Sequence, residues 1–377
     1  MGRNAHLCMH ASREVSLIAV EEWKVRHFLE HYQLQLNYFE EFGKIIKVHT
    51  NNGIFVIKSV PATKGIDFVK NIQQLYQKGY NRIVPIFATV ENSYGVIVDH
   101  QLWYLMPWLP NQHGVEGAER KKQLLRELAR MHVLSAKETT VDTEEQEAHF
   151  HTTKERLERQ QSFLEEFSQL TERKWYMSPF ELQYCAYHQD IYQALNYSIK
   201  KLTEWYDRTK EEGKIRVVTA HGKLSLDHFL YAENGYGHFI NLEEADEVAA
   251  HFDVLPFTAD LLDTYPRQNS DILDLLDYYF KFFPWRIEEI MLFSSYLASP
   301  ERCVAVVEDF FHRKNEKSEI ELCRELQLEY WLLKNTEFVI MQLEQRIQAM
   351  EAAKKEESEP DDKPPPPQQQ PPPAPIL

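Results

Sequence analysis

Two neighbouring segments, 217–235 and 237–257, carry the side chains with the most distinctive chemistry in the sequence. Between them they hold several ionisable and amide groups at close spacing: His221, Lys223, Asp227, His228, Asn241 and Glu243. A lysine with a pKa of about 10.4 is charged at neutral pH. Lys223 therefore cannot accept a proton, and it would attract anions instead. The alternative is that it is an ordinary surface lysine on a loop without chemistry.

The same segments offer poor ligands for a hard cation. Asn241 has only a neutral carbonyl oxygen, and a neutral His228 is a weak partner for Mg²⁺, which prefers carboxylates. Asp227 and Glu243 are nearby acids, and either carboxylate could bind a metal ion or act as a base instead. The other interpretation is that both are solvated loop charges.

Composition excludes several classes of function. Lys plus Arg number 42 against 58 Asp plus Glu, a formal charge of −16 over 377 residues. An acidic chain repels phosphate backbones and anionic lipid, so we expect no nucleic-acid partner. No stretch approaches the roughly 18 apolar residues of a membrane span, and the first twenty residues have no run of signal-peptide type. We therefore expect synthesis in the cytoplasm, without insertion into a membrane.

Other candidate sites are weaker. The four cysteines are scattered without a CxxC pair, which argues against zinc and disulfides and favours a reducing compartment. His149 and His151 follow a run of acids and are expected to lie in a loop. His6, Cys8 and His10 are expected to lie in a mobile N-terminus, and Ser225 has no credible triad. We expect no metal site.

Around these segments, the N-terminal third reads as a small sheet. Asn51-Asn52-Gly53 between two β-branched runs is typical of a hairpin turn, because Gly tolerates positive φ. The sequence predicts strands at 44–50, 54–60, 83–90 and 95–109, with a turn near Asp99-His100 in the last, and one helix at 66–78.

The remainder reads as mostly helical. Apolar residues at three-to-four spacing predict helices over 117–136, 153–175, 181–212, 285–298, 301–313 and 315–357. From about 358 onward the chain is rich in Pro and Gln, with proline runs that favour extended polyproline II. This tail is expected to be a disordered, solvating terminus, or alternatively a docking ligand for a partner domain.

The order of these elements resembles a protein kinase, with a sheet lobe followed by a helical lobe. Kinases of the aminoglycoside phosphotransferase type carry H-G-D-x-x-x-x-N and then D-F-D or D-F-E, whose acids serve as base and Mg²⁺ ligands. Here His221-Gly222 match, Lys223 replaces the Asp, His228 replaces the Asn, and Asn241 replaces the metal-binding Asp. The resemblance implies an α+β, two-lobed kinase-like fold with a degenerate site.

The resemblance also implies a nucleotide-binding remnant. Lys58 stands where a kinase lysine contacts phosphates, and Met106 lies in the hinge-like Tyr-Leu-Met-Pro-Trp run of 104–108. Without the resemblance, Lys58 would be an ordinary strand lysine. The kinase lysine pairs with a helix Glu, but the helix at 66–78 has none, so we expect that pair to be absent.

The hairpin T-N-N-G-x-F-x-x-K, the hinge run, the segment LARMHVLSA (128–136) and the loop H-G-x-L resemble the CotS family of spore coat proteins. Length and the degenerate loop are most similar to its YsxE branch. The resemblance covers about 15–350. It implies synthesis in the mother cell, deposition in the spore coat, and other coat proteins as partners.

We therefore expect a pseudokinase that is a structural component of the spore coat, with no cofactor. The expected parts are a mobile N-terminus (1–14), a β-rich lobe (15–107), a helical lobe (108–357) and the tail (358–377). The alternative is an active or residual ATP- and Mg²⁺-dependent small-molecule phosphotransferase that uses Glu243 or Asp227. A third possibility is a nucleotide or metabolite sensor without catalysis.

Overall fold

The computed structural model describes residues 20–64, 67–111, 117–264, 271–312 and 317–358. The chain divides into two compact units. The first unit comprises Met1–His149 and Thr209–Pro284, and the second comprises Phe150–Arg208 and Trp285–Leu377. The predicted N-terminal segment 1–14, and all of the tail 358–377 except Ser358, lie outside the described residues.

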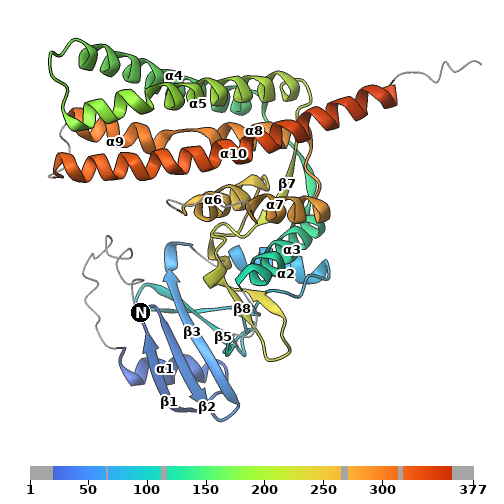
Figure 1. The fold of residues 1–377 in the computed structure, drawn as a ribbon. Coiled ribbons are helices and arrows are strands. Elements are labelled where there is room, and N and C mark those ends of the chain that lie inside the picture. The colour runs from blue at the N-terminus through green and yellow to red at the C-terminus, as the bar shows by residue number, and fades with distance from the viewer. Residues whose placement is uncertain (1–19, 65–66, 112–116, 265–270, 313–316, 359–377) are drawn as a thin grey trace, which may run out of the picture. The chain divides into compact units, whose positions relative to one another are not determined.

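The first unit contains a five-stranded antiparallel sheet of order β1-β2-β3-β5-β4 (Figure 1). Its strands are β1 (Leu36–Phe42), β2 (Ile45–Thr50), β3 (Gly53–Pro61), β4 (Val96–Val98) and β5 (Gln101–Pro107). The predicted hairpin is confirmed, because Thr50 pairs with Gly53 and the positive φ of 127° falls on Gly53. The predicted turn at Asp99-His100 is also confirmed, and both residues have positive φ.

The two faces of this sheet differ in character. Helix α1 (Glu22–Glu30) packs its buried Phe28 and Leu29 against a cluster that includes Ile57 and Leu105. Residues directly opposite across antiparallel strands share a face, and faces alternate along each strand. Lys58, which pairs with Tyr104 across β3 and β5, therefore lies on the other face. The core on one face fixes the register that places Lys58 on the opposite one.

The prediction of a strand at 83–90 was wrong. Ile83 bridges Phe239 in parallel, whereas Phe87 bridges Leu105 in antiparallel orientation. Pro85 lies between them and has no backbone N–H to donate. The segment is extended, but its backbone N–H groups bond to several separate partners, among them Phe239, Leu105 and His31. Strand β1 and helix α1 were not predicted.

The rest of the first unit positions the two chemistry-bearing segments. Its helices are α2 (Asp67–Gln77), α3 (Gly117–Ser135), α6 (His251–Leu262) and α7 (Asp271–Phe282), with 3₁₀ turns η1 (Ala62–Lys64), η2 (Leu226–His228) and η3 (Leu242–Glu244). A three-stranded antiparallel sheet has the order β10-β7-β6, formed by β10 (Asp246–Val248), β7 (Lys214–Ala220) and β6 (Lys137–Thr140). Strands β8 (Phe229–Tyr231) and β9 (Gly237–Phe239) form a hairpin.

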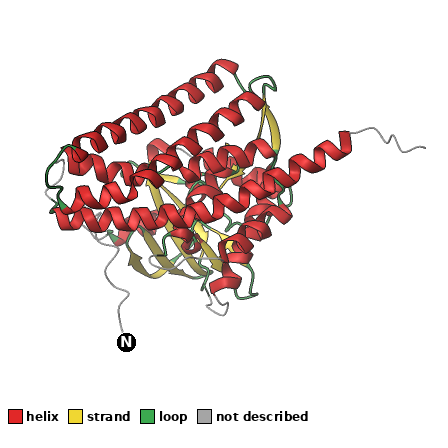
Figure 2. Cartoon of the chain, turned by 45° about the horizontal axis from the view of Figure 1, so that its top comes forward, coloured by secondary structure: helices red, strands yellow, loops and turns green. Residues whose placement is uncertain are grey.

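The second unit is helical (Figure 2). It is built from most of α4 (Thr143–Glu172) and α5 (Pro179–Thr209), with α8 (Ile287–Ala298), α9 (Glu301–His312) and α10 (Glu319–Ser358). The predicted helices are confirmed within a few residues, apart from the start of α4. By length and composition alone, the stretch Ile287–His312 could cross a membrane, but 72% of its most apolar window is buried in protein, as in a core helix.

The prediction that His149 and His151 lie in a loop was wrong. Both lie in α4, which begins ten residues earlier than predicted. The Asp142 carboxylate accepts a hydrogen bond from the Glu144 backbone N–H at 2.9 Å, a capping interaction that starts the helix. Glu144 and Glu145 in the first turn complement the helix dipole. The acidic run is thus a helix start.

Candidate functional site

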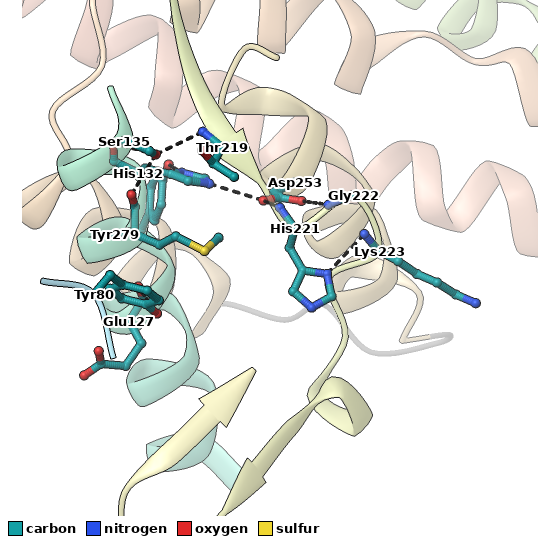
Figure 3. A network of polar contacts seen from close by, with 11 residues as sticks. Tyr80, Glu127, His132, Ser135, Thr219, His221, Gly222, Lys223, Asp253 and Tyr279 are labelled. Atoms are coloured by element: carbon teal, nitrogen blue, oxygen red, sulfur yellow. Dashed lines mark hydrogen bonds and ion pairs between the residues drawn. The ribbon is translucent and has the colours of Figure 1, made fainter. Parts of the chain in front are cut away.

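The loop that follows β7 is anchored by a fully buried carboxylate. Asp253, in the first turn of α6, accepts the His221 backbone N–H at 2.6 Å and the Gly222 backbone N–H at 2.9 Å (Figure 3). His132 on α3 reaches the same carboxylate through Nε2 at 3.2 Å. Asp253 therefore fixes the backbone of the loop at its first two residues.

Hydrogen bonds from several directions keep this carboxylate ionised. Burial alone would raise the pKa of Asp253, but the His132 and His221 contacts hold it below its usual value. His132 is itself oriented by the Tyr279 hydroxyl on α7, 2.7 Å from Nδ1. A buried charge is tolerated only when it is hydrogen-bonded, and Asp253 accepts three hydrogen bonds.

The His221 ring ties the loop to the segment that contains Asn241. Its Nε2 donates to the Ile240 carbonyl at 2.8 Å, and its Nδ1 accepts the Lys223 backbone N–H at 3.2 Å. The contact at Nδ1 requires the neutral ring, because a protonated Nδ1 could not accept. Burial lowers the pKa of His221, so the ring is neutral at pH 7. His221 acts as a structural bridge between the two segments.

Gly222 allows these two segments to pack closely. Its φ is +78°, and a Cβ built there would lie 2.1 Å from the Glu244 carbonyl oxygen. No residue with a side chain fits this position without displacing backbone.

Lys223 occupies an exposed position at the turn of the loop. Figure 3 shows its side chain pointing away from the Asp253 network. It lines an open cavity of about 390 Å³ together with the carboxylate-bearing Glu244 and Asp246. The position therefore carries a solvated cation.

The two other polar residues of the loop have structural contacts. His228 Nδ1 donates to the Lys223 carbonyl at 2.8 Å, and its ring lies parallel to that of His221 with centroids 5.8 Å apart. The exposed Asp227 has its backbone N–H bound by the Ser225 hydroxyl at 3.2 Å. His228 braces the loop, and the Asp227 carboxylate faces solvent.

On the sheet, Lys58 is engaged by the segment after β9. Its Nζ donates to Asn241 Oδ1 at 2.6 Å and forms an ion pair with Glu243. The Tyr104 hydroxyl donates to the same Glu243 carboxylate. The Lys58 and Glu243 side chains are only 15% and 8% exposed. Helix α2 has no Glu to pair with Lys58, as expected, but Lys58 does have an acidic partner, which comes from η3 instead.

The segment 240–245 is also held from α2. The Asn71 side-chain amide donates to the Ala245 carbonyl at 2.9 Å. Asn241 has left-handed backbone angles (φ 64°, ψ 45°), which turn the chain into η3 and place Glu243 toward Lys58. Burial would raise the pKa of Glu243, but Lys58 and Tyr104 outweigh it and keep that pKa below the usual value. Glu243 is therefore ionised at neutral pH.

The structure thus brings most of the predicted residues together in the first unit. Met106 is buried and lies opposite Val56 in the sheet. Sequence reasoning assigned no role to His132, Tyr104, Tyr279 or Asn71. In the part of the chain that the structure describes, no three His, Cys, Asp or Glu side chains cluster as metal ligands.

Solved phosphotransferase structures are similar to this chain. An aminoglycoside phosphotransferase from Alicyclobacillus acidocaldarius matches with a TM-score of 0.64 and 14% identity, over 86% of this chain and 96% of that one. The chain has an aminoglycoside phosphotransferase-like fold. Spectinomycin phosphotransferase with AMP bound gives a TM-score of 0.52 at 13% identity, covering 84% of this chain and 98% of that one. No family model and no curated protein sequence matches.

These comparisons confirm the predicted fold, an antiparallel sheet followed by a largely helical region. At such low identity they show the fold alone, because one fold supports many functions. Membership of the CotS family stays a prediction.

Replacing Gly222 should destabilise the protein much more than replacing Gly235. Both glycines have positive φ, +78° and +76°, so each Ala variant incurs backbone strain of roughly 1–2 kcal/mol. Only Gly222 has a neighbour within 4 Å of the added Cβ. We expect Gly222→Ala to lose at least about 1 kcal/mol more unfolding free energy than Gly235→Ala, as measured by urea denaturation. Equal losses would show that the two segments are not in close contact.

Proposed function

We propose that this protein is a pseudokinase, with the fold of a small-molecule phosphotransferase and without phosphotransfer activity. The observation that carries the proposal is Lys223, an exposed cation on a loop whose shape is otherwise held by Asp253. In a kinase this loop presents a carboxylate that accepts the proton of the substrate hydroxyl. A lysine that is charged at neutral pH cannot do so.

The donor set does not fit Mg²⁺–ATP. The two positions that hold the metal in kinases are filled by an asparagine and a histidine, and both side chains are already engaged. Asn241 Oδ1 accepts from Lys58, and His228 Nδ1 donates to the Lys223 carbonyl. Mg²⁺ prefers carboxylate oxygens and near-octahedral geometry. The residues at these two positions therefore do not fit Mg²⁺–ATP.

The alternative is a phosphotransferase with residual activity. It is favoured by the fold comparisons, which match phosphotransferases, one of them in complex with ADP and spectinomycin with a TM-score of 0.50. Of the two acids that could support it, Glu243 is paired with Lys58 and shielded from solvent. Asp227 is exposed, so it is the acid that would act in a residual phosphotransferase.

Purified wild-type protein should form no ADP from Mg²⁺–ATP above a protein-free control, with water or a panel of amino sugars as acceptor. The physical reason is the missing base and the missing metal carboxylates. The measurement is a coupled ADP-release assay on wild type and Asp227→Asn. A Mg²⁺-dependent rate that disappears in Asp227→Asn would establish the alternative.

We further propose that the protein serves as a structural component of the bacterial spore coat. This rests on the sequence resemblance to the CotS family alone. The proposal includes synthesis in the mother cell, other coat proteins as partners, and docking through the Pro-rich tail.

A fluorescent fusion expressed in a sporulating bacterium should move from the mother-cell cytoplasm to a shell around the forespore. A fusion lacking 359–377 separates the tail from the body as the docking element. Fluorescence that stays diffuse in the mother cell throughout sporulation would contradict a coat role.

A further inference from the structure

The cationic end of Lys58 is satisfied entirely from within the chain. Its Nζ contacts Asn241 Oδ1 at 2.6 Å and the Glu243 carboxylate, which the Tyr104 hydroxyl also binds. Both members of the ion pair are largely shielded from solvent. The arrangement is one cation and one hydroxyl donor converging on one carboxylate oxygen.

A carboxylate and a phosphate present the same chemistry to such donors. Each offers anionic oxygens that accept charge-assisted hydrogen bonds from ammonium and hydroxyl groups. The Glu243 carboxylate therefore fills the position that an anionic ligand of Lys58 would take. Two further cations, Lys44 and Lys223, lie near enough to act on Lys58 electrostatically.

We propose that Glu243 is an internal anion that closes an anion-binding site formed by Lys58 and Tyr104, so that the wild-type protein excludes phosphate groups there. The proposal rests on the proposed function, because a working metal site would supply its own acids. It names Glu243 as the residue that decides whether the site takes an anion. Removing its side chain opens the site to phosphate without any metal.

The closure is built into the fold. Leu242 is buried beside Glu243, Asn71 holds the Ala245 carbonyl, and Gly222 packs against the Glu244 carbonyl. These three contacts hold the backbone on both sides of Glu243. Its carboxylate is held by Lys58 and the Tyr104 hydroxyl in the absence of any ligand.

The loss of Glu243 would leave a shielded, unpaired cation. Removing one partner of a buried ion pair is costly because the remaining charge is uncompensated. An external anion can restore the compensation, and Lys44 and Lys223 add to the attraction. This is the physical reason to expect a gain of binding in a variant that has lost a charge.

The test uses the full-length chain in metal-free buffer containing a chelator. Inorganic phosphate and ADP are titrated by calorimetry into wild type, Glu243→Ala and Glu244→Ala, the last removing the same side chain one residue away at an exposed position. We expect Glu243→Ala to bind phosphate at least about tenfold more tightly than wild type, a gain of about 1.4 kcal/mol. Glu244→Ala should behave as wild type, and raised salt should weaken the new binding.

A second variant keeps the test sharp. Adding Lys58→Met to Glu243→Ala should abolish the gain. Tyr104→Phe keeps the Glu243 carboxylate and loses a donor of the anion site, so it should bind phosphate no more tightly than wild type, and a gain in this variant would show that Glu243 does not close the site. Equal phosphate affinity in wild type and the Glu243 variant, or a gain that survives Lys58→Met, would overturn the proposal. Turnover of ATP by wild type would instead overturn the proposed function, so the two failures are distinguishable.

Discussion

The buried carboxylate of Asp253 is the constraint on which the rest of the site depends. It is fully buried, so its oxygens need donors from the protein, and the chain supplies two backbone N–H groups and the His132 imidazole. Leaving such a group unpaired would cost several kcal/mol. Asp253 holds the loop through the backbone N–H groups of His221 and Gly222. These contacts do not depend on the side chain that follows Gly222, so the loop keeps its shape whatever that side chain is.

The structure separates this scaffold from its chemistry. Asp253 and His221 hold the loop, while the position that extends from it carries the Lys223 cation. At the other end of the site, the acid that pairs with Lys58 comes from η3. The charged groups are thus separate from the contacts that hold the backbone of the site, so the fold alone is a poor guide to activity.

Much of the fold could be predicted from local patterns in the sequence. Asn51-Asn52-Gly53 marked a hairpin, and three-to-four spacing found the long helices. The prediction of a strand at 83–90 was wrong because β-branched composition does not reveal that the backbone hydrogen bonds of this segment go to several separate partners. The start of α4 was missed because the Asp142 cap was overlooked. Strand β1, with Asn37, Glu40 and Glu41 among its seven residues, does not alternate cleanly between apolar and polar.

The site was harder to predict because its decisive contacts join distant residues. Lys58 and Asn241 are 183 positions apart, and nothing local to either indicates that Glu243 completes the pair.

Calorimetric titration of wild type with ATP, with and without Mg²⁺, tests the central claim most directly. A site without metal carboxylates and with Lys58 already neutralised predicts weak affinity that Mg²⁺ changes by no more than about twofold. A gain of about tenfold or more on adding Mg²⁺ would show that an acidic metal site survives and would contradict the account.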